Sequence, residues 1–480
     1  MFRLRLLAQK LTAPLARTIR RGFRATSSLH YEFMPDHEPF CALPGRQPTQ
    51  ASSGEEAFYF LKDGANVFIQ GGAATPSLIV QELHDYIVRN DLKDITIYHL
   101  PPLGPFPFFS VEEQHRFRAN AFYTAPEGRK AVQQGKADYM PIFLSEIPLL
   151  FNRGLIKLDV ALISITPPDK HGLCSLGPSL DVTRSAILNA DHIVAQVNNQ
   201  LPLCRGDASV HISHVTVTRD GPMSPHTLPL TRPTEIQEKI GTLIAENLIN
   251  DGATIQAGTG GIPSATLSKL MDHRDLGIHT DIFSDEMVRL VETGAVTNRF
   301  KEIRPGKIVA CLVLGTSRVF DFIDDNPVID LTDAGLVCSS INVALNPQPI
   351  AIATCMEMDI TGQAASDSLG TDVYSGFGGK VDFLRGAFIS QDHLGKAIIA
   401  FTSLTKDGKS KIVPFLKDGT GVVNSRAHIH YVVTEYGIAD LFGKNIRQRA
   451  HALIQIAHPK FREGLERSAF EILNVMPSPD

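Results

Sequence analysis

The sequence predicts an α/β protein made of two similar open, largely parallel-sheet domains. Three observations predict this fold class: short apolar runs alternate with amphipathic stretches, one strand, glycine loop and helix pattern occurs in each half, and a proline-rich segment separates the halves. Continuous apolar runs between helical stretches are typical of parallel strands covered on both faces. At 480 residues, with 43% hydrophobic and 20% charged residues, the chain is long enough for two domains and has the composition of a globular protein.

The expected strands are short runs rich in apolar and β-branched residues, which favour extended structure. In the first half they cover residues 95–98, 160–165, 193–197 and 212–217, and in the second half residues 308–314, 350–354, 397–401 and 431–434.

The repeated pattern begins at Asp63 and again at Asp251. Each copy passes through a turn and a short strand into a glycine loop, and then into a helix that opens at a Pro-Ser pair, Pro76 or Pro263. Ligands of open α/β sheets bind beyond the carboxyl ends of the strands, where such loops lie. The two glycine loops are therefore the first places to expect a ligand.

A linker is expected between the two repeats. Residues 221–234 contain four prolines, which cannot continue a helix or a central strand. This divides the chain into an N-terminal domain, residues 31–220, and a C-terminal domain, residues 235–480.

Residues 1–30 are basic, and the first acidic residue of the chain is Glu32. The basic residues are Arg3, Arg5, Lys10, Arg17, Arg20, Arg21 and Arg24. Together with Ser and Thr and with Leu and Ile at helix-like spacing, they indicate a mitochondrial transit peptide and localisation in the matrix. The alternative is a basic tail that binds nucleic acid or membrane, but no interleaving of aromatic and basic residues supports nucleic-acid binding.

The six cysteines are widely scattered and form no CxxC pair, which argues against a zinc ribbon or a redox motif. Isolated cysteines suit a reducing compartment. We predict no metal site. No apolar run of about 18 residues is free of charges, so we also expect no membrane span and no membrane partner.

One carboxylate segment stands between two glycine-rich turns. Residues 277–285, Gly-Ile-His-Thr-Asp-Ile-Phe-Ser-Asp, follow the turn at 258–263 and precede the turn at 375–379. Backbone N–H groups of such turns hold anionic ligands, while a carboxylate can perform chemistry on them. The segment therefore predicts an enzyme that acts on a polyanionic substrate.

These motifs, taken together, resemble the acetyl-CoA hydrolase/transferase family, which includes acetate:succinate and 4-hydroxybutyrate CoA-transferases. The resemblance is carried by residues 256–263, 276–280, 375–379, 381–387 and 433–439, with 166–172 and 197–202 in the first half. It implies two open α/β domains of the CoA-transferase type with the active site between them, in agreement with the repeat.

The resemblance implies a CoA-transferase that moves CoA between an acyl-CoA, expected to be acetyl-CoA, and a small carboxylic acid, expected to be succinate. A carboxylate attacks the thioester and becomes an enzyme CoA thioester through a mixed anhydride. Coenzyme A is then a substrate, and no permanently bound cofactor is expected. A homodimer is implied as well, and no nucleic-acid partner.

The resemblance also assigns residues to roles. Asp281 stands at the position of the family's nucleophilic glutamate, Gln256 and Gly379 stabilise the oxyanion, and Glu435 orients the site. The implied coenzyme A contacts are Gly258, Thr259, Gly260, Gly261, Ile262, Met356, Ser375, Gly379 and Lys406. The residues alone leave plainer alternatives open: a strand-end amide for Gln256, a tight turn for the glycines, a helix cap near Ala439 for Glu435 and a solvated lysine for Lys406.

Aspartate at position 281 departs from the family pattern. It withdraws the carboxylate by on the order of 1.5 Å, and a displacement near 1 Å can cost about a hundredfold in rate. An acetyl-CoA hydrolase, in which the recessed carboxylate activates water, and a weakened CoA-binding paralogue are therefore alternatives. Glu286 is the candidate replacement acid, or else an exposed helix charge. Lys380 also departs, since the family usually has glutamine there.

Overall fold

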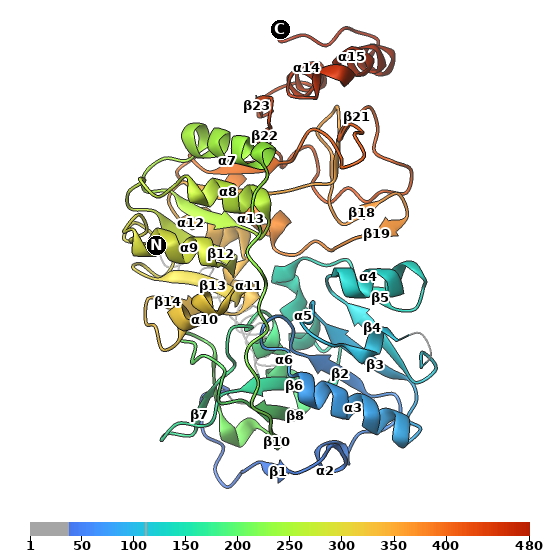
Figure 1. Ribbon diagram of the computed structural model, residues 1–480, viewed down its shortest axis with the longest axis vertical. Coiled ribbons are helices and arrows are strands. Elements are labelled where there is room, and N and C mark those ends of the chain that lie inside the picture. Colours follow the sequence, from blue (N-terminus) through green and yellow to red (C-terminus); the bar gives the residue numbers. More distant parts are fainter. Residues whose placement is uncertain (1–37, 111–112) are drawn as a thin grey trace, which may run out of the picture.

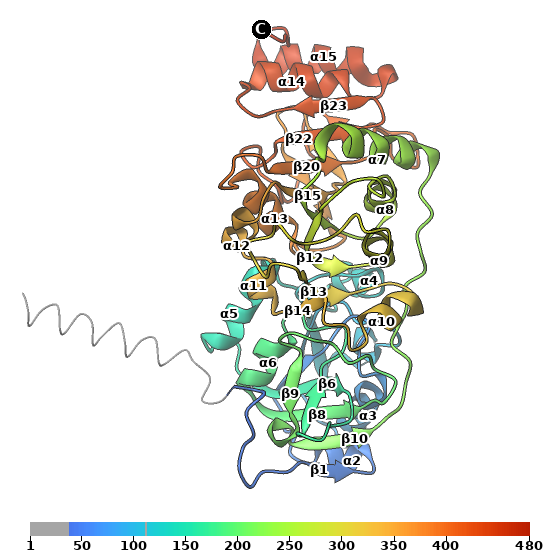
Figure 2. The same ribbon diagram turned by 90° about the vertical axis from the view of Figure 1, so that its left-hand side faces the viewer.

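The computed structural model describes residues 38–110 and 113–480 (Figure 1). The expected transit peptide, residues 1–30, lies outside the described residues. Two large sheets form the framework, and the N-terminal sheet lies below the C-terminal one in the view of Figure 2.

The first sheet has eight strands in the order β1-β10-β8-β6-β2-β3-β4-β5, and every pair in it is parallel. Its strands are β1 (Thr49–Ala51), β2 (Asn66–Ile69), β3 (Ile95–His99), β4 (Phe117–Ala121), β5 (Asp138–Tyr139), β6 (Leu158–Ile165), β8 (Ala190–Val197) and β10 (Val217–Asp220). The helices of this half are α2 (Gly54–Phe58), α3 (Ser77–Arg89), α4 (Pro126–Gln133), α5 (Ile147–Asn152) and α6 (Thr183–Asn189), with 3-10 turns η1 (Pro107–Phe109), η2 (Leu144–Glu146) and η3 (Ile212–His214). A short pair, β7 (Leu173–Ser175) and β9 (Ser209–His211), stands apart.

The second sheet also has eight strands, in the order β14-β13-β12-β11-β15-β20-β22-β23, and only its last pair is antiparallel. Its strands are β11 (Thr254–Ala257), β12 (Gly277–Phe283), β13 (Ile308–Val313), β14 (Ile329–Leu331), β15 (Pro349–Ala353), β20 (Lys396–Ala400), β22 (Tyr431–Thr434) and β23 (Gly437–Asp440). The predicted fold of two open, largely parallel sheets is confirmed.

The helices of the second half are α7 (Glu235–Leu248), α8 (Gly261–Ser268), α9 (Asp285–Glu292), α10 (Ser317–Ile323), α11 (Ala334–Val337), α12 (Ser340–Leu345), α13 (Lys380–Phe388), α14 (Ile446–Gln455) and α15 (Pro459–Leu473). Small strands β16 (Glu357–Asp359), β17 (Ala364–Ala365) and β21 (Ile412–Val413) form one further sheet, and β18 (Ser368–Leu369) and β19 (Asp372–Val373) another. Helices α14 and α15 lie at the end of the molecule farthest from the first sheet (Figure 2).

Most predicted strands match the structure, but the strand expected at residues 212–217 is wrong. Residues Ile212–His214 form the 3-10 turn η3, and β10 begins only at Val217. The ring Nδ1 of His211 accepts a hydrogen bond of 3.2 Å from the backbone N–H of Ser213. A side chain that satisfies a nearby backbone donor offers the chain an alternative to a ladder bond, and the alternating apolar pattern does not reveal it.

The second sheet reverses its direction of growth between β11 and β15. From β11 the chain adds β12, β13 and β14 on one side, and then crosses back to add β15, β20 and β22 on the other. Such a topological switch point opens a crevice at the carboxyl ends of the two strands. The first sheet has the same arrangement, with its switch between β2 and β6.

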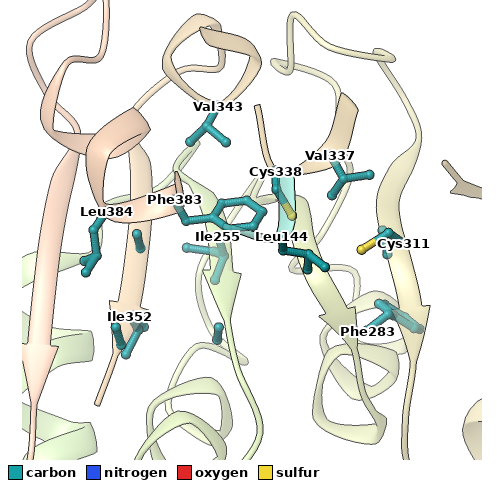
Figure 3. Close-up of a cluster of buried hydrophobic side chains, with 14 of the residues drawn as sticks. Leu144, Ile255, Phe283, Cys311, Val337, Cys338, Val343, Ile352, Phe383 and Leu384 are labelled. Atoms are coloured by element: carbon teal, nitrogen blue, oxygen red, sulfur yellow. The ribbon is translucent and has the colours of Figure 1, made fainter. Parts of the chain in front are cut away.

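The two sheets share one buried apolar cluster, which includes Phe68 from the first half and Phe383 from the second. Figure 3 shows Leu144 of η2 among second-half residues of this cluster, beside Cys338. Backbone bonds add to the contact, because the N–H groups of Leu180 and Asp181 both donate to the carbonyl of Cys311. The halves are therefore packed together at the ends of β12 and β13.

The expected linker contains no helix or strand and bonds to both halves. The backbone N–H of His226 donates to Ala73, and that of Leu228 donates to Gly315. In the sequence, the strands of the first sheet precede this segment and those of the second sheet follow it. The domain boundaries at 31–220, 221–234 and 235–480 stay a prediction. Among the described helices, none is long and apolar enough to cross a membrane.

Candidate active site

The carboxylate of Asp281, in β12, is held from one side. The side-chain Nε2 of Gln256, at the end of β11, donates to Oδ1 of Asp281 at 3.1 Å. The backbone N–H of Ile282 donates to the same oxygen at 3.0 Å, and the hydroxyl of Thr280 lies 3.4 Å from it. The other oxygen, Oδ2, makes no hydrogen bond with any residue that the structure describes, so it is the oxygen left for chemistry.

Asp281 lies deep in the protein but keeps part of its surface accessible, as a group at the base of a cleft does. Burial raises the pKa of Asp281, while the hydrogen bonds from Gln256 and Ile282 act in the opposite direction. A raised pKa makes the ionised carboxylate a stronger base and nucleophile than an exposed one.

The backbone of Gly379 lies against the free oxygen of Asp281. A Cβ atom at this position would stand 2.8 Å from Oδ2 of Asp281 and 3.2 Å from Sγ of Cys338. Gly379 is also the N-cap of α13, where backbone N–H groups lack partners within the helix. Glycine thus permits a close approach of the backbone that no side chain would allow.

The loop that carries Gly379 is held by the N-terminal half. The carbonyl of Gly378 accepts from the N–H of Leu144 at 3.1 Å, and that of Tyr374 accepts from Nε of Arg129 at 3.0 Å. Tyr123 packs on Gly376 and Gly378, where an added Cβ would come within 2.9 Å and 3.4 Å of its ring. The N-terminal half therefore sets how closely this loop approaches Asp281.

Of the two repeated glycine loops, only the second is open. A Cβ added to Gly258 or Gly260 would meet nothing within 4 Å, and Gly260 has a φ of 119°. In the first copy, a Cβ on Gly72 would stand 2.7 Å from the hydroxyl of Ser179 and 2.9 Å from Leu312. The protein itself fills the space beside Gly72 and leaves the space beside Gly258 and Gly260 open.

The remaining residues of the second loop have separate positions. Thr259 is exposed, Gly261 begins α8, and Ile262 is buried in the core. The side chain of Gln237 from α7 lies against Gly261, where an added Cβ would be 2.3 Å from its Oε1. The loop thus ends on a rigid helix pair at the carboxyl edge of the sheet.

The three other implied coenzyme contacts follow different strands. Met356 lies between β15 and β16, immediately before β16, and is partly exposed. Ser375 donates from its hydroxyl to the carbonyl of Ser366 at 2.8 Å and hydrogen-bonds with the side chain of Tyr123. Lys406 lies in an exposed turn after β20. Ser375 thus contacts Tyr123, which packs on the loop of Gly379, whereas no described contact joins Met356 or Lys406 to Gln256, Asp281 or Gly379.

Glu435 is buried at the end of β22, but away from Asp281. Its carboxylate accepts from the N–H of Ser403 at 2.9 Å and from the Ser403 hydroxyl at 2.5 Å. Because β12 and β22 are four strands apart in the sheet, the two acids are separated by on the order of 19 Å. The alternative role as a helix cap near Ala439 is wrong, since Gly437–Asp440 form β23.

Two further residues of the carboxylate segment have structural partners. Glu286 is partly buried and accepts from the hydroxyls of Ser264 and Ser284, at 2.7 Å and 3.0 Å. It is therefore not the exposed helix charge that the sequence suggested. His279 is buried, and its Nε2 lies 2.7 Å from the carbonyl of Val337.

Sequence reasoning missed two residues of the site, Tyr123 and Lys380. Tyr123 belongs to the N-terminal half, so no motif around Asp281 could reveal it. Lys380 was visible only as a departure from the family pattern, and the structure places its ammonium in the electrostatic environment of Asp281. Within residues 38–110 and 113–480, no group of three or more His, Cys, Asp or Glu side chains is arranged to hold a metal ion.

The fold and the site define an α/β protein of two parallel sheets with a largely enclosed carboxylate, Asp281, and an open glycine loop in the second. Residues 47–227 match the acetyl-CoA hydrolase/transferase N-terminal domain, and residues 315–469 match the C-terminal domain of the same name. The chain belongs to the acetyl-CoA hydrolase/transferase family, and the resemblance read from the motifs is confirmed.

Two curated relatives of high identity are named as CoA-transferases. The chain is 58% identical over the full length of both chains to a succinyl-CoA:acetate/propanoyl-CoA:succinate CoA transferase of Fasciola hepatica. It is 40% identical to the 4-hydroxybutyrate coenzyme A transferase of Clostridium kluyveri, over 77% of this chain and 86% of the relative. The predicted class of enzyme, a CoA-transferase, is thereby confirmed.

Solved structures have the same fold. A 4-hydroxybutyrate CoA-transferase of Porphyromonas gingivalis superposes with a TM-score of 0.75 at 34% identity, covering 89% of this chain and 97% of that one. RipA of Yersinia pestis superposes with a TM-score of 0.83 at 27% identity, covering 89% and 98%.

Proposed function

We propose that the protein transfers CoA between acetyl-CoA and succinate through a CoA thioester on Asp281. The observation that carries the proposal is the convergence of Gln256, Asp281 and Gly379 at the switch point, beside the open loop at Gly258. The Fasciola hepatica relative, whose name includes succinyl-CoA and acetate, supports this pair of acids.

The first half-reaction uses the free oxygen of Asp281. Oδ2 attacks the thioester carbonyl of acetyl-CoA, the carbon–sulfur bond breaks, and CoA leaves as the thiolate. The thiolate then attacks the aspartyl carbonyl of the mixed anhydride and releases acetate. The product is an aspartyl-CoA thioester.

The second half-reaction reverses these steps with the acceptor. A carboxylate of succinate attacks the aspartyl carbonyl, and the thiolate leaves. The thiolate then attacks the succinyl carbonyl of the new anhydride, which gives succinyl-CoA and restores Asp281. Protons need not be transferred in either half, in agreement with the buried and backbone-bonded ring of His279.

Developing negative charge is stabilised by preorganised donors. The amide of Gln256 already donates to Asp281, and the N-terminus of α13 at Gly379 faces the same carboxylate. Such donors are worth about 3 kcal/mol each in other enzymes.

The open loop at Gly258 and Gly260, with Thr259, Gly261 and Ile262, is proposed to hold coenzyme A, together with Met356, Ser375 and Gly379. Lys406 in its exposed turn would contact the far end of the coenzyme. Glu435, bonded to Ser403, would keep the end of β20 in place rather than touch the reacting atoms. No permanently bound cofactor enters this reaction.

The decisive experiment follows free thiol and succinyl-CoA together after acetyl-CoA is added with and without succinate. Transfer gives succinyl-CoA only when both are present. Borohydride reduction of the enzyme after incubation with acetyl-CoA, followed by peptide mass spectrometry, should locate the thioester at Asp281. Thiol release without succinyl-CoA and without a labelled residue would instead identify a hydrolase, and a label on Glu286 would refute the assignment.

We further propose that the protein acts in the mitochondrial matrix as a homodimer. The basic, acid-free residues 1–30 support the localisation. Sequencing the native N-terminus tests the transit peptide, because an intact Met1 would contradict cleavage. Sedimentation of the purified protein tests the dimer.

A further inference from the structure

Lys380 follows directly on the glycine that lies beside Asp281. Lys380 is the first residue of α13 and follows Gly379, whose backbone touches Asp281. Its electrostatic partners are Cys355, just after β15, together with Asp367 and Asp281. The ammonium therefore shares the electrostatic environment of Asp281.

Lys380 differs from three other lysines with buried or partly buried side chains because no protein group in the described residues pairs with its ammonium. The Nζ atoms of Lys301, Lys396 and Lys411 all donate to an oxygen of the protein, at 2.6 to 3.1 Å. The Nζ of Lys380 makes no hydrogen bond and no ion pair with any residue in the described part of the chain. Burial lowers the pKa of Lys380, while Cys355, Asp367 and Asp281 act in the opposite direction.

Because no protein group pairs with it, the ammonium of Lys380 is available to an anionic ligand, and pairing stabilises a charge in a confined site. The side chain keeps some accessible surface, so it faces the cleft rather than the core. Neutral ligands or a monocarboxylate whose only charged group reacts at Asp281 would leave the ammonium unpaired. A dicarboxylate has a second charged group that could reach it.

We propose that Lys380 binds the non-reacting carboxylate of a dicarboxylate acceptor while the other carboxylate reacts at Asp281. The proposal rests on the proposed CoA transfer and names the class of acid that this site prefers. The same contact would hold the free carboxylate of the dicarboxylate's mono-CoA thioester. Lys380 is then a specificity-determining residue, and without it two negative charges would meet in a confined space with Asp281.

The simpler role for Lys380 is to neutralise Asp367 and Asp281. Asp367 has other partners, since its carboxylate accepts from the hydroxyl of Ser368 at 3.0 Å and lies 3.5 Å from the hydroxyl of Tyr139. A purely neutralising lysine would affect every acceptor equally. The two roles therefore differ in how a substitution affects acids of different charge.

The test uses Lys380→Gln and Lys380→Arg in the full-length protein, with propanoyl-CoA as the common donor. Acceptors are succinate, its monomethyl ester and acetate, and the new CoA thioesters are separated by chromatography. We expect Lys380→Gln to lower kcat/KM for succinate by about tenfold or more, mainly by raising KM. A change of this size is typical for the loss of a hydrogen bond to a charged group. Acetate and monomethyl succinate should change by less than about threefold, and Lys380→Arg should restore succinate in part.

The matched control is Arg385→Gln, which removes one positive charge from the last turn of the same helix. It should leave the ratio of succinate to acetate unchanged. An equal loss for all three acceptors in Lys380→Gln would overturn the proposal and leave the CoA-transferase function intact. A parent protein that transfers CoA to none of the acids would overturn the proposed function, and this proposal with it.

Discussion

The side-chain amide of Gln256 lies 3.1 Å from Oδ1 of Asp281 and donates to it across two neighbouring strands. This contact fixes one oxygen of the Asp281 carboxylate and leaves the other free. It also opposes the effect of burial on the pKa of Asp281. The hydrogen bond from Gln256 therefore both orients the carboxylate of Asp281 and favours its ionised form.

Replacing Gln256 with alanine should reduce kcat by about 10² to 10³, as loss of an oxyanion donor does in other enzymes. It should also raise the pKa of Asp281 further, because the amide stabilises the ionised form. Since the nucleophile must be ionised, the acidic limb of the pH–rate profile should shift to higher pH. Profiles of kcat for parent and variant measure both effects, and an unshifted limb would show that Gln256 does not act on Asp281.

The substitution Asp281→Glu should raise the ratio of transfer to hydrolysis, because the added methylene brings the carboxylate forward and fills space where water could stand. Asp281→Ala should abolish transfer. Both are measured from thiol release and succinyl-CoA formation in one assay. If Asp281→Ala still transfers CoA, another residue is the nucleophile, and Glu286→Gln is the variant to examine next.

A Cβ at position 379 would stand 2.8 Å from the nucleophilic oxygen, so Gly379→Ala should displace either the loop or the carboxylate. A displacement near 1 Å can cost about a hundredfold in turnover. The control is Gly464→Ala in α15, where an added Cβ meets nothing within 4 Å. This control should keep full activity and gain about 0.5–1 kcal/mol in stability. Equal activity of both variants would contradict the assigned role of Gly379.

Asp382 should make the stability of the protein depend on pH. Burial raises the pKa of Asp382 to about 7, against the hydrogen bonds from Ser145 of the N-terminal half. Between the ordinary value of 3.8 and about 7, the unfolded chain releases this proton while the folded protein keeps it, so stability falls as pH rises. Asp382→Asn should remove this loss and gain on the order of 2 kcal/mol more at pH 8 than at pH 5.

Urea unfolding of the parent and of Asp382→Asn at both pH values checks this prediction. The control is Asp321→Asn, an exposed aspartate of α10, which should shift stability equally at the two pH values. A gain for Asp382→Asn that is the same at pH 5 and pH 8 would contradict the linkage.

The sequence by itself determined the fold class and the family. Apolar runs such as residues 160–165 and 308–314 are continuous, as is typical of parallel strands that are buried on both faces. Gln256 lies in β11 and Asp281 lies in the neighbouring strand β12. The pairing of these two strands brings the two side chains together. The strand expected at 212–217 failed because the ring of His211 satisfies a backbone donor locally, which periodicity cannot show.

Only the tertiary structure decided which implied residues meet. Glu435 and Asp281 appear in one family pattern, but four strand spacings separate them across the sheet. The first glycine loop looks like the second in sequence, yet Ser179 and Leu312 from distant segments fill the space beside Gly72. These outcomes depend on contacts between residues far apart in the chain. A local sequence pattern does not specify which distant residues pack against it. For that reason the open loop, the approach of Gly379 to Asp281 and the unpaired ammonium of Lys380 became visible only in the folded protein.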